Sequence, residues 1–172
     1  MILQFHIPPA PLNNHIELIT YYKGYHPPHR IERLLPDGGI DLIIDLTAIP
    51  KYIYDNDTLK EIQSCKKAWI SGMRTEYISI QARADESEMM VIRFRPGMAW
   101  SFLHMPVMEI KNRVVEAELV FGNEFLSFRE QLLVKPGTDE KFAIAETYLL
   151  GRIKNHFEVH PAIQYCISAI GN

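Results

Sequence analysis

The chain has 172 residues, 47% of them hydrophobic, and its 18 Lys and Arg against 21 Asp and Glu leave a formal net charge of −3. This length and hydrophobicity fit one domain of ordinary size with a sizeable core, and they exclude intrinsic disorder as the first interpretation. A slightly acidic chain lacks the cationic excess that neutralises DNA phosphates, so we do not expect this chain to bind DNA by itself.

The first half of the chain is typical of β-strands. The opening MILQFHIPPAP is a short apolar piece broken by prolines, which indicates an edge strand or arm. Residues 15–25 are rich in the Ile, Thr and Tyr that suit a pleated, half-buried surface. Residues 31–35 and 40–46 flank Pro36-Asp37-Gly38-Gly39, a tight-turn sequence that predicts a hairpin. Further strands are predicted at residues 51–54, 67–71, 77–84 and 88–95.

After Pro96-Gly97 the pattern becomes helical. Residues 99–105 predict one or two turns, and Asn123 is a suitable N-cap for a helix that ends at Pro136-Gly137. Thr138 caps a longer helix over residues 139–157, and residues 161–170 form a last apolar helical segment. The apolar positions of the long helix follow three- and four-residue spacing: Phe142, Ala145, Leu149, Ile153 and Phe157. Strands followed by helices predict an α+β domain, in which a small barrel or sandwich leads into a helical pair.

Two arginines on the predicted strand 88–95 are candidates for a binding site. Arg93 and Arg95 alternate there with apolar residues, so one face of a central strand carries two cations, and Asp41 and Asp45 alternate in the same way on another strand. Cross-strand ion pairing or plain exposure would explain this pattern. The functional alternative is a polar lining inside the barrel that holds an anionic or hydroxylated ligand, with guanidinium as a bidentate donor.

Aromatic residues could complete such a ligand site. Trp69 and Tyr77 lie on other predicted strands and would provide an aromatic wall. The candidate ligand-binding residues are therefore Arg93, Arg95, Trp69 and Tyr77.

Motifs for metal binding and catalysis are absent from the sequence. His26 and His29 form the only close histidine pair, and the two prolines between them impose an extended backbone on which the imidazoles need not converge. There is no Gly-x-Ser-x-Gly nucleophile turn, and Asp37-Gly38-Gly39 precedes a strand rather than the helix of a phosphate-binding loop. We therefore expect no metal, no cofactor and no enzyme activity.

The setting is predicted to be cytoplasmic. Cys65 and Cys166 lie far apart in the sequence, and no charged-then-apolar leader is found. No apolar run approaches the roughly 20 residues needed to cross a bilayer, so we expect no association with a membrane.

Four strings of the sequence follow a recognisable pattern. Residues 32–43 (ERLLPDGGIDLI) follow R-x-LPDG-x-x-(D/E)-L-(I/V), and residues 91–99 (VIRFRPGMA) are similar to V-R-F-R-P-G-G-A. Residues 109–115 match E-(L/I)-x-(D/N)-x-V-V, Gly122 follows, and residues 148–153 match L-x-x-R-(L/I). Together these strings resemble the sensor domain of AraC-type (AraC/XylS) bacterial transcription regulators. The sequence departs from the family at Met98, where glycine is frequent, and at Tyr21-Tyr22, where Tyr-Trp is usual.

The resemblance implies a cupin-like antiparallel β-barrel over about residues 1–97 that senses an effector, followed by a C-terminal helical pair over about 98–157 that dimerises. It also implies that residues 158–172 open a DNA-binding domain that is missing from this chain, so that the chain is a truncated piece. The expected partners are a second copy of the chain and a small-molecule effector, with DNA contacted only through the missing domain.

Two alternatives to a regulator's sensor domain stay open. The first is a stand-alone cupin-like small-molecule-binding protein or enzyme, and the second is an interaction domain with no ligand. The mode of assembly is open as well, because the apolar stripe of the long helix could be satisfied by packing on the barrel. We expect a dimer because Ile144, Tyr148 and Leu150 add apolar surface off that stripe.

Overall fold

The computed structural model describes residues 1–84, 86–153 and 161–170. Its strands are β1 (Ile2–His6), β2 (Ile16–Lys23), β3 (Ile31–Leu34), β4 (Ile40–Asp45), β5 (Lys51–Tyr54), β6 (Glu61–Cys65), β7 (Ala68–Ser71), β8 (Ile78–Gln81), β9 (Glu88–Phe94) and β10 (Val114–Glu116). Its α-helices are α1 (Trp100–Leu103), α2 (Ala117–Phe121), α3 (Glu124–Val134), α4 (Thr138–Arg152) and α5 (Pro161–Ile170). Two short 3₁₀ turns lie at Leu12–Asn14 and Val107–Ile110.

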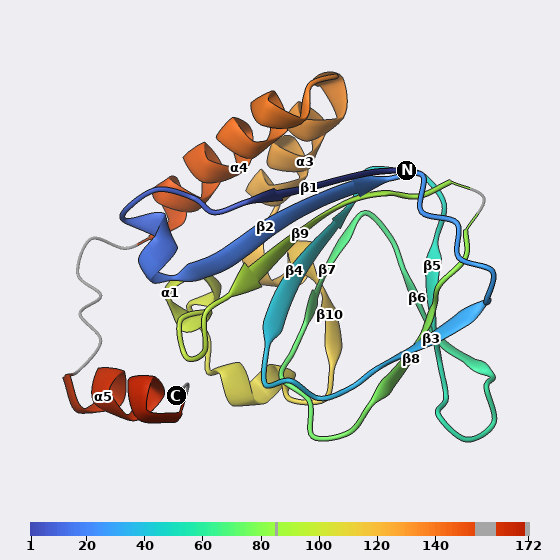
Figure 1. Ribbon diagram of the computed structural model, residues 1–172, viewed down its shortest axis with the longest axis horizontal. Helices are drawn as coiled ribbons and strands as arrows, with labels where there is room; N and C mark the ends of the chain where they lie inside the picture. Colours follow the sequence, from blue (N-terminus) through green and yellow to red (C-terminus); the bar gives the residue numbers. More distant parts are fainter. Residues whose placement is uncertain (85, 154–160, 171–172) are drawn as a thin grey trace.

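The strands form two antiparallel sheets. One sheet has six strands in the order β1-β2-β9-β4-β7-β10, and the other has four in the order β3-β8-β5-β6. Figure 1 shows α3 and α4 along one side of the six-stranded sheet and the four-stranded sheet on its other side. The α+β class and the passage from strands to helices are confirmed, and β9 is a central strand as predicted.

The two sheets do not close into the barrel that the sequence predicted. No backbone ladder joins them within the described residues, and the contact between their edge strands β6 and β10 is made by a side chain. Gln63 Nε2 donates to the Val114 carbonyl at 3.0 Å. Side-chain contacts, and not continuous backbone pairing, join the sheets at this edge, so the two-sheet arrangement stays open there.

The predicted hairpin at Pro36–Gly39 is also wrong. β3 pairs with β8 and β4 pairs with β9 and β7, so the turn carries the chain from one sheet to the other. The turn itself forms as expected: Gly38 has a φ of +73°, and the Gly39 amide donates to Asp37 Oδ1 at 2.9 Å. Turn chemistry is local, whereas the choice of strand partner depends on the rest of the chain.

The main core lies between the six-stranded sheet and the helices. On β9, Met90, Ile92 and Phe94 face this core, as period-two alternation requires. The helices contribute buried residues at helical spacing: Phe125, Phe128 and Leu132 from α3, and Phe142, Ala145 and Leu149 from α4. Most of the apolar stripe predicted for the long helix is thus buried within the chain itself.

The long helix, α4, ends at Arg152 instead of residue 157, because the backbone of Ile153 is extended. Phe157 lies outside the described residues.

A charged cluster also joins α4 to the sheet. Glu88, at the start of β9, accepts hydrogen bonds from the Tyr21 hydroxyl at 2.9 Å and from Lys23 Nζ at 2.8 Å. The same carboxylate lies 3.8 Å from Lys141 Nζ, whose side chain is only 4% exposed and also donates to the Leu132 carbonyl. Glu88 therefore neutralises Lys141, which α4 buries against the sheet.

Within the described residues, no helix is both long enough and apolar enough to cross a bilayer.

Candidate functional site

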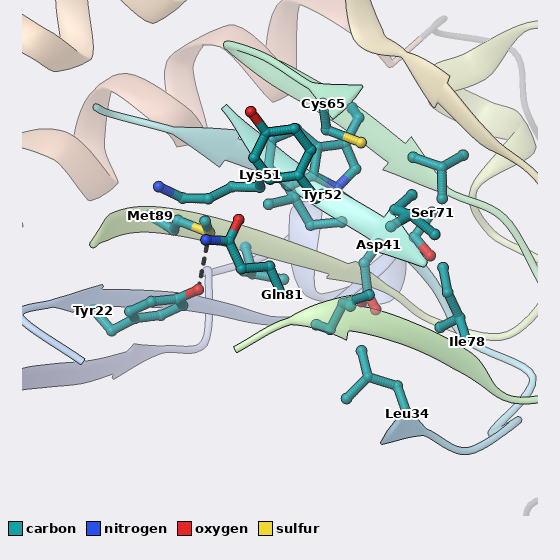
Figure 2. Close-up of a pocket in the computed structure, with 16 residues that line it drawn as sticks. Tyr22, Leu34, Asp41, Lys51, Tyr52, Cys65, Ser71, Ile78, Gln81 and Met89 are labelled. Atoms are coloured by element: carbon teal, nitrogen blue, oxygen red, sulfur yellow. Dashed lines mark hydrogen bonds between the residues drawn. The ribbon is translucent and has the colours of Figure 1, made fainter. Parts of the chain in front are cut away.

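A cavity of about 220 Å³ lies between the two sheets (Figure 2). Every strand except β1 contributes at least one lining side chain. The lining residues are Tyr22, Leu34, Asp41, Ile43, Lys51, Tyr52, Ile53, Cys65, Trp69, Ser71, Ile78, Ile80, Gln81, Met89, Val91 and Val114. A cavity walled by two sheets is held by many independent strands, which favours a preformed site over one that depends on a single loop.

Strand alternation explains which side chains reach the cavity. On β9, Met89 and Val91 line it while their neighbours Met90 and Ile92 face the helices. On β4, Asp41 lines the cavity in the same way. The register pairs Asp41 with Arg93 across β4 and β9, so an acidic and a basic side chain lie opposite each other near one end of the site.

The Asp41 carboxylate is already paired. Arg93 Nε and Nη2 donate to its two oxygens, each at 2.9 Å, and Arg93 Nη1 lies 2.8 Å from Asp37 Oδ2 in the β3–β4 turn. These hydrogen bonds to Asp41, outweighing the opposing effect of burial, raise the pKa of the guanidinium above its ordinary value. The cross-strand ion pairing considered for Arg93 is therefore present, and its guanidinium is fully engaged by protein carboxylates.

Lys51 is the cationic residue in the cavity wall. Its ammonium donates to the Glu86 carbonyl at 3.1 Å, to the Ile49 carbonyl at 3.3 Å and to Thr47 Oγ1 at 3.4 Å. It also lies 3.4 Å from Oδ2 of Asp45, which is 1% exposed. An ammonium has three protons to donate, so this lysine has a protein partner for each of them.

Two further titratable groups of the cavity wall, Tyr22 and Cys65, stay neutral at pH 7. Burial, with the negative charges of Asp45 and Glu32, raises the pKa of Tyr22 to about 12, and its hydroxyl donates to Met89 Sδ at 2.8 Å. Burial, helped by the negative charge of Glu116, raises the pKa of the Cys65 thiol to about 12 as well. A protonated thiol is a poor nucleophile and a poor metal ligand, so at neutral pH these groups offer hydrogen bonds instead of reactive anions.

One buried acceptor among the lining residues, on Gln81, has no hydrogen-bond partner in the protein. Gln81 Nε2 donates to the Arg83 carbonyl at 2.8 Å, which fixes the orientation of the amide. Gln81 Oε1 is then a buried acceptor without a hydrogen bond. Buried acceptors are normally satisfied, so such an atom in a cavity wall is a position where a ligand donor would be stabilised.

The candidate ligand residues from the sequence fall in different places. Trp69 lines the cavity. Tyr77 lines a separate, more open hollow next to it, where the Arg33 guanidinium lies 5.1 Å from the centre of its ring. Arg93 is held by Asp41 and Asp37, and Arg95 follows the end of β9 as an exposed residue whose Nε donates to the Asn13 carbonyl at 2.7 Å.

Sequence reasoning missed most of the polar lining. Tyr22 and Gln81 come to the cavity from strands of different sheets, and Lys51 comes from a third strand. The Tyr-rich pattern of residues 15–25 signalled a half-buried strand but not which neighbour its outer face would meet. Only the register of β2 against β9, which pairs Tyr22 with Met89, places that tyrosine at the cavity.

The histidine pair has separate partners. His26 Nδ1 lies 3.2 Å from the Ala84 carbonyl, and His29 Nε2 lies 4.0 Å from Glu32. Over residues 1–84, 86–153 and 161–170, no three histidine, cysteine, aspartate or glutamate side chains are grouped so that they could hold a metal ion.

Fold and cavity together define an α+β protein that encloses a small hollow between two antiparallel sheets. Residues 4–116 match the family described as Domain of unknown function (DUF6597), and the chain belongs to that family. The matched region runs from β1 to the end of β10, so it contains every residue of the cavity wall. Comparison with curated proteins gives no match.

Proposed function

We propose that this chain is the effector-sensing and dimerisation domain of an AraC-type bacterial transcription regulator, and that it does not itself contact DNA. The observation that carries the proposal is the cavity between the sheets, which is mostly apolar and has a few fixed polar groups. Such a lining is the usual form of a small-molecule site. In this proposal the two sheets are an open form of the cupin-like sensor, and the effector binds between them.

The strings that carry the AraC-type resemblance support this assignment by their positions. Residues 32–43 run along β3, through the turn and along β4, and they include the lining residues Leu34, Asp41 and Ile43. Residues 91–99 cover the end of β9 and the turn before α1, and they include the lining residue Val91. The segments that most resemble a sensor domain are therefore segments that build the cavity.

The chemistry of the cavity favours binding over catalysis. Cys65 and Tyr22 are held in their protonated forms, and Lys51 donates to carbonyl groups instead of presenting a free amine. An enzyme that used Cys65 or Tyr22 as nucleophile or base would need the pKa of that group lowered, whereas both pKa values are raised. We therefore propose a binding domain. We also propose that it is cytoplasmic and that residues 1–157 form the sensing and dimerisation unit.

Dimerisation is proposed to involve α4, through a smaller surface than the sequence suggested. Tyr148 stacks on Phe128 with ring centres 4.1 Å apart, so it belongs to the core. Leu150 is 45% exposed and is the residue of α4 that offers apolar surface to a partner. A second copy of the chain on this helix would give the two-fold arrangement that suits paired DNA half-sites.

Sedimentation equilibrium tests the assembly. The chain should be dimeric at tens of micromolar, and Leu150→Glu should shift it toward monomer without lowering its unfolding temperature. Ile62→Glu is the matched control, since Ile62 is an equally hydrophobic exposed residue on β6 of the other sheet. A monomeric wild-type chain, or a Leu150→Glu variant as dimeric as wild type, would remove α4 as the interface.

A substitution that fills the cavity tests whether small molecules bind there. Ile43→Trp places an indole in the wall, so single-ring compounds that raise the unfolding temperature of wild type should lose this effect in the variant. Equal stabilisation of both proteins would place binding outside the cavity and contradict the proposal.

In a gel-shift assay at physiological salt, specific binding of this chain to DNA upstream of its own gene would contradict the statement that it does not contact DNA.

A further inference from the structure

We infer that the ligand of the cavity is an uncharged, largely apolar molecule of about one ring, with a hydroxyl or N–H group that donates to Gln81 Oε1. This inference rests on the proposed small-molecule-binding function and names the chemical class that the same cavity would select.

The size of the cavity sets the first limit on its ligand. The cavity measures about 220 Å³. An apolar protein cavity of about 150 Å³ holds one benzene molecule, so this one accommodates a single ring with a short substituent. Trp69, Ile43 and Val91 are among the apolar and aromatic residues of its wall, and such walls stabilise a ring by burial and by aromatic contact.

Charge sets the second limit, because the ionised groups of the wall are already neutralised. A cationic ligand would have to compete for Asp41 with a guanidinium that contacts both carboxylate oxygens at 2.9 Å. An anionic ligand would have to share Lys51 with Asp45, which is buried 3.4 Å away. Two carboxylates on one buried ammonium repel each other, and desolvating a ligand charge without a free partner is costly. Neutral ligands incur neither cost.

The unpartnered acceptor sets the third limit. Gln81 Oε1 is buried and without a hydrogen bond, and its amide is fixed because Nε2 donates to the Arg83 carbonyl. Figure 2 shows the Gln81 side chain projecting among the residues that line the cavity. A ligand that brings a hydroxyl or N–H group satisfies this oxygen, while a ligand of the same shape with only acceptors leaves it unsatisfied.

Four single-ring probes of similar shape test the inference by calorimetric titration of the whole chain. Benzamide is neutral with an N–H donor, methyl benzoate is neutral without one, benzoate is an anion, and benzylamine is a cation at neutral pH. Benzamide should bind at least tenfold more tightly than benzoate or benzylamine. Gln81→Leu should weaken the binding of benzamide roughly fivefold, as expected for the loss of one neutral hydrogen bond. The same substitution should leave the affinity for methyl benzoate unchanged.

A matched control separates the acceptor from general effects of the substitution. Gln4→Leu makes the same change on β1, the strand that contributes nothing to the cavity wall, and should leave the affinity of every probe unchanged. Equal or tighter binding of benzoate or benzylamine would overturn the inference of a neutral ligand and leave the cavity as a small-molecule site. Unchanged benzamide affinity in Gln81→Leu would overturn the role of Gln81. Failure of all four probes to bind would overturn this inference, while the sedimentation and DNA-binding tests would still decide the regulator assignment.

Discussion

Replacing Glu88 by Gln tests whether the charged cluster that joins α4 to the sheet stabilises the fold. The substitution keeps the size of the side chain and leaves an amide oxygen for the Tyr21 hydroxyl, but removes the negative charge that faces Lys141. Lys23 is 56% exposed, so its ion pair with Glu88 contributes at most about 1 kcal/mol. Lys141 is 4% exposed, and a buried ammonium that loses its partner typically costs several kcal/mol.

The expected loss of stability is smaller than several kcal/mol, because two features reduce the cost of leaving Lys141 without its carboxylate. The Glu88 side chain is 18% exposed to water, and Lys141 retains its hydrogen bond to the Leu132 carbonyl. We expect Glu88→Gln to lower the free energy of unfolding by about 2 kcal/mol at neutral pH. For a chain of this size, that corresponds to a fall of roughly 4–8 °C in unfolding temperature.

The destabilisation should depend on pH in a defined direction. Burial tends to raise the pKa of Glu88, but hydrogen bonds from Lys23 and Tyr21 and the positive charges of Lys23 and Lys141 outweigh it, and the pKa is lowered. Because the pKa is lower in the folded state than in the unfolded state, the stabilisation is complete above the unfolded value and is lost as pH falls through the folded value. The difference between wild type and Glu88→Gln should therefore be largest near neutral pH and shrink in acid.

Urea denaturation followed by tryptophan fluorescence, at neutral and at acidic pH, measures this difference. Lys141→Met provides the second side of a double-mutant cycle, because methionine fills a similar volume without a charge. The two substitutions should be coupled, with the double variant less destabilised than the sum of the single variants. A destabilisation that is the same at both pH values, or a coupling energy near zero, would refute the electrostatic reasoning.

Three further predictions concern the two cysteines and two of the glycines. A thiol reagent at neutral pH should label one cysteine per native chain, at the exposed Cys166, because the Cys65 thiol is buried and its pKa is raised to about 12; labelling of both before unfolding would contradict this. Gly72→Ala should lower the free energy of unfolding by about 3 kcal/mol, because its new methyl group would meet the Ile110 carbonyl oxygen at 1.8 Å. Gly151→Ala in α4, with nothing within 4 Å, should instead stabilise the chain by about 0.5 kcal/mol in the same denaturation assay.

Local patterns in the sequence predicted most elements of the fold, and the misses share a physical cause. The strand at residues 51–54 and the turn at Pro36–Gly39 were found because alternation and turn chemistry are properties of adjacent residues. β6 (Glu61–Cys65) was missed because four of its five residues are not fully buried, so it has no clear alternation. β10 is only three residues long and returns to the sheet after α1, where the pattern had already become helical.

The candidate site was less accessible to sequence reasoning than the elements that form it. Alternation showed that Arg93 lies on a polar face, and it left open whether the residue pairs with another strand or meets a ligand. The register of β9 against β4 brings Arg93 opposite Asp41 and thereby decides for pairing. Trp69 reaches the cavity, whereas Tyr77, from a segment that precedes β8, lines the neighbouring hollow.

The sequence by itself determined the α+β class, the passage from strands to helices and the buried face of α4, because each depends on the periodicity of a continuous segment. Only the tertiary structure decided that β3 and β4 separate into different sheets, that these sheets stay open, and that a buried, unpartnered Gln81 oxygen belongs to the wall of the cavity between them. Those features depend on which distant strands pair and in what register, and a shift of one residue would turn every side chain of a strand to its other face.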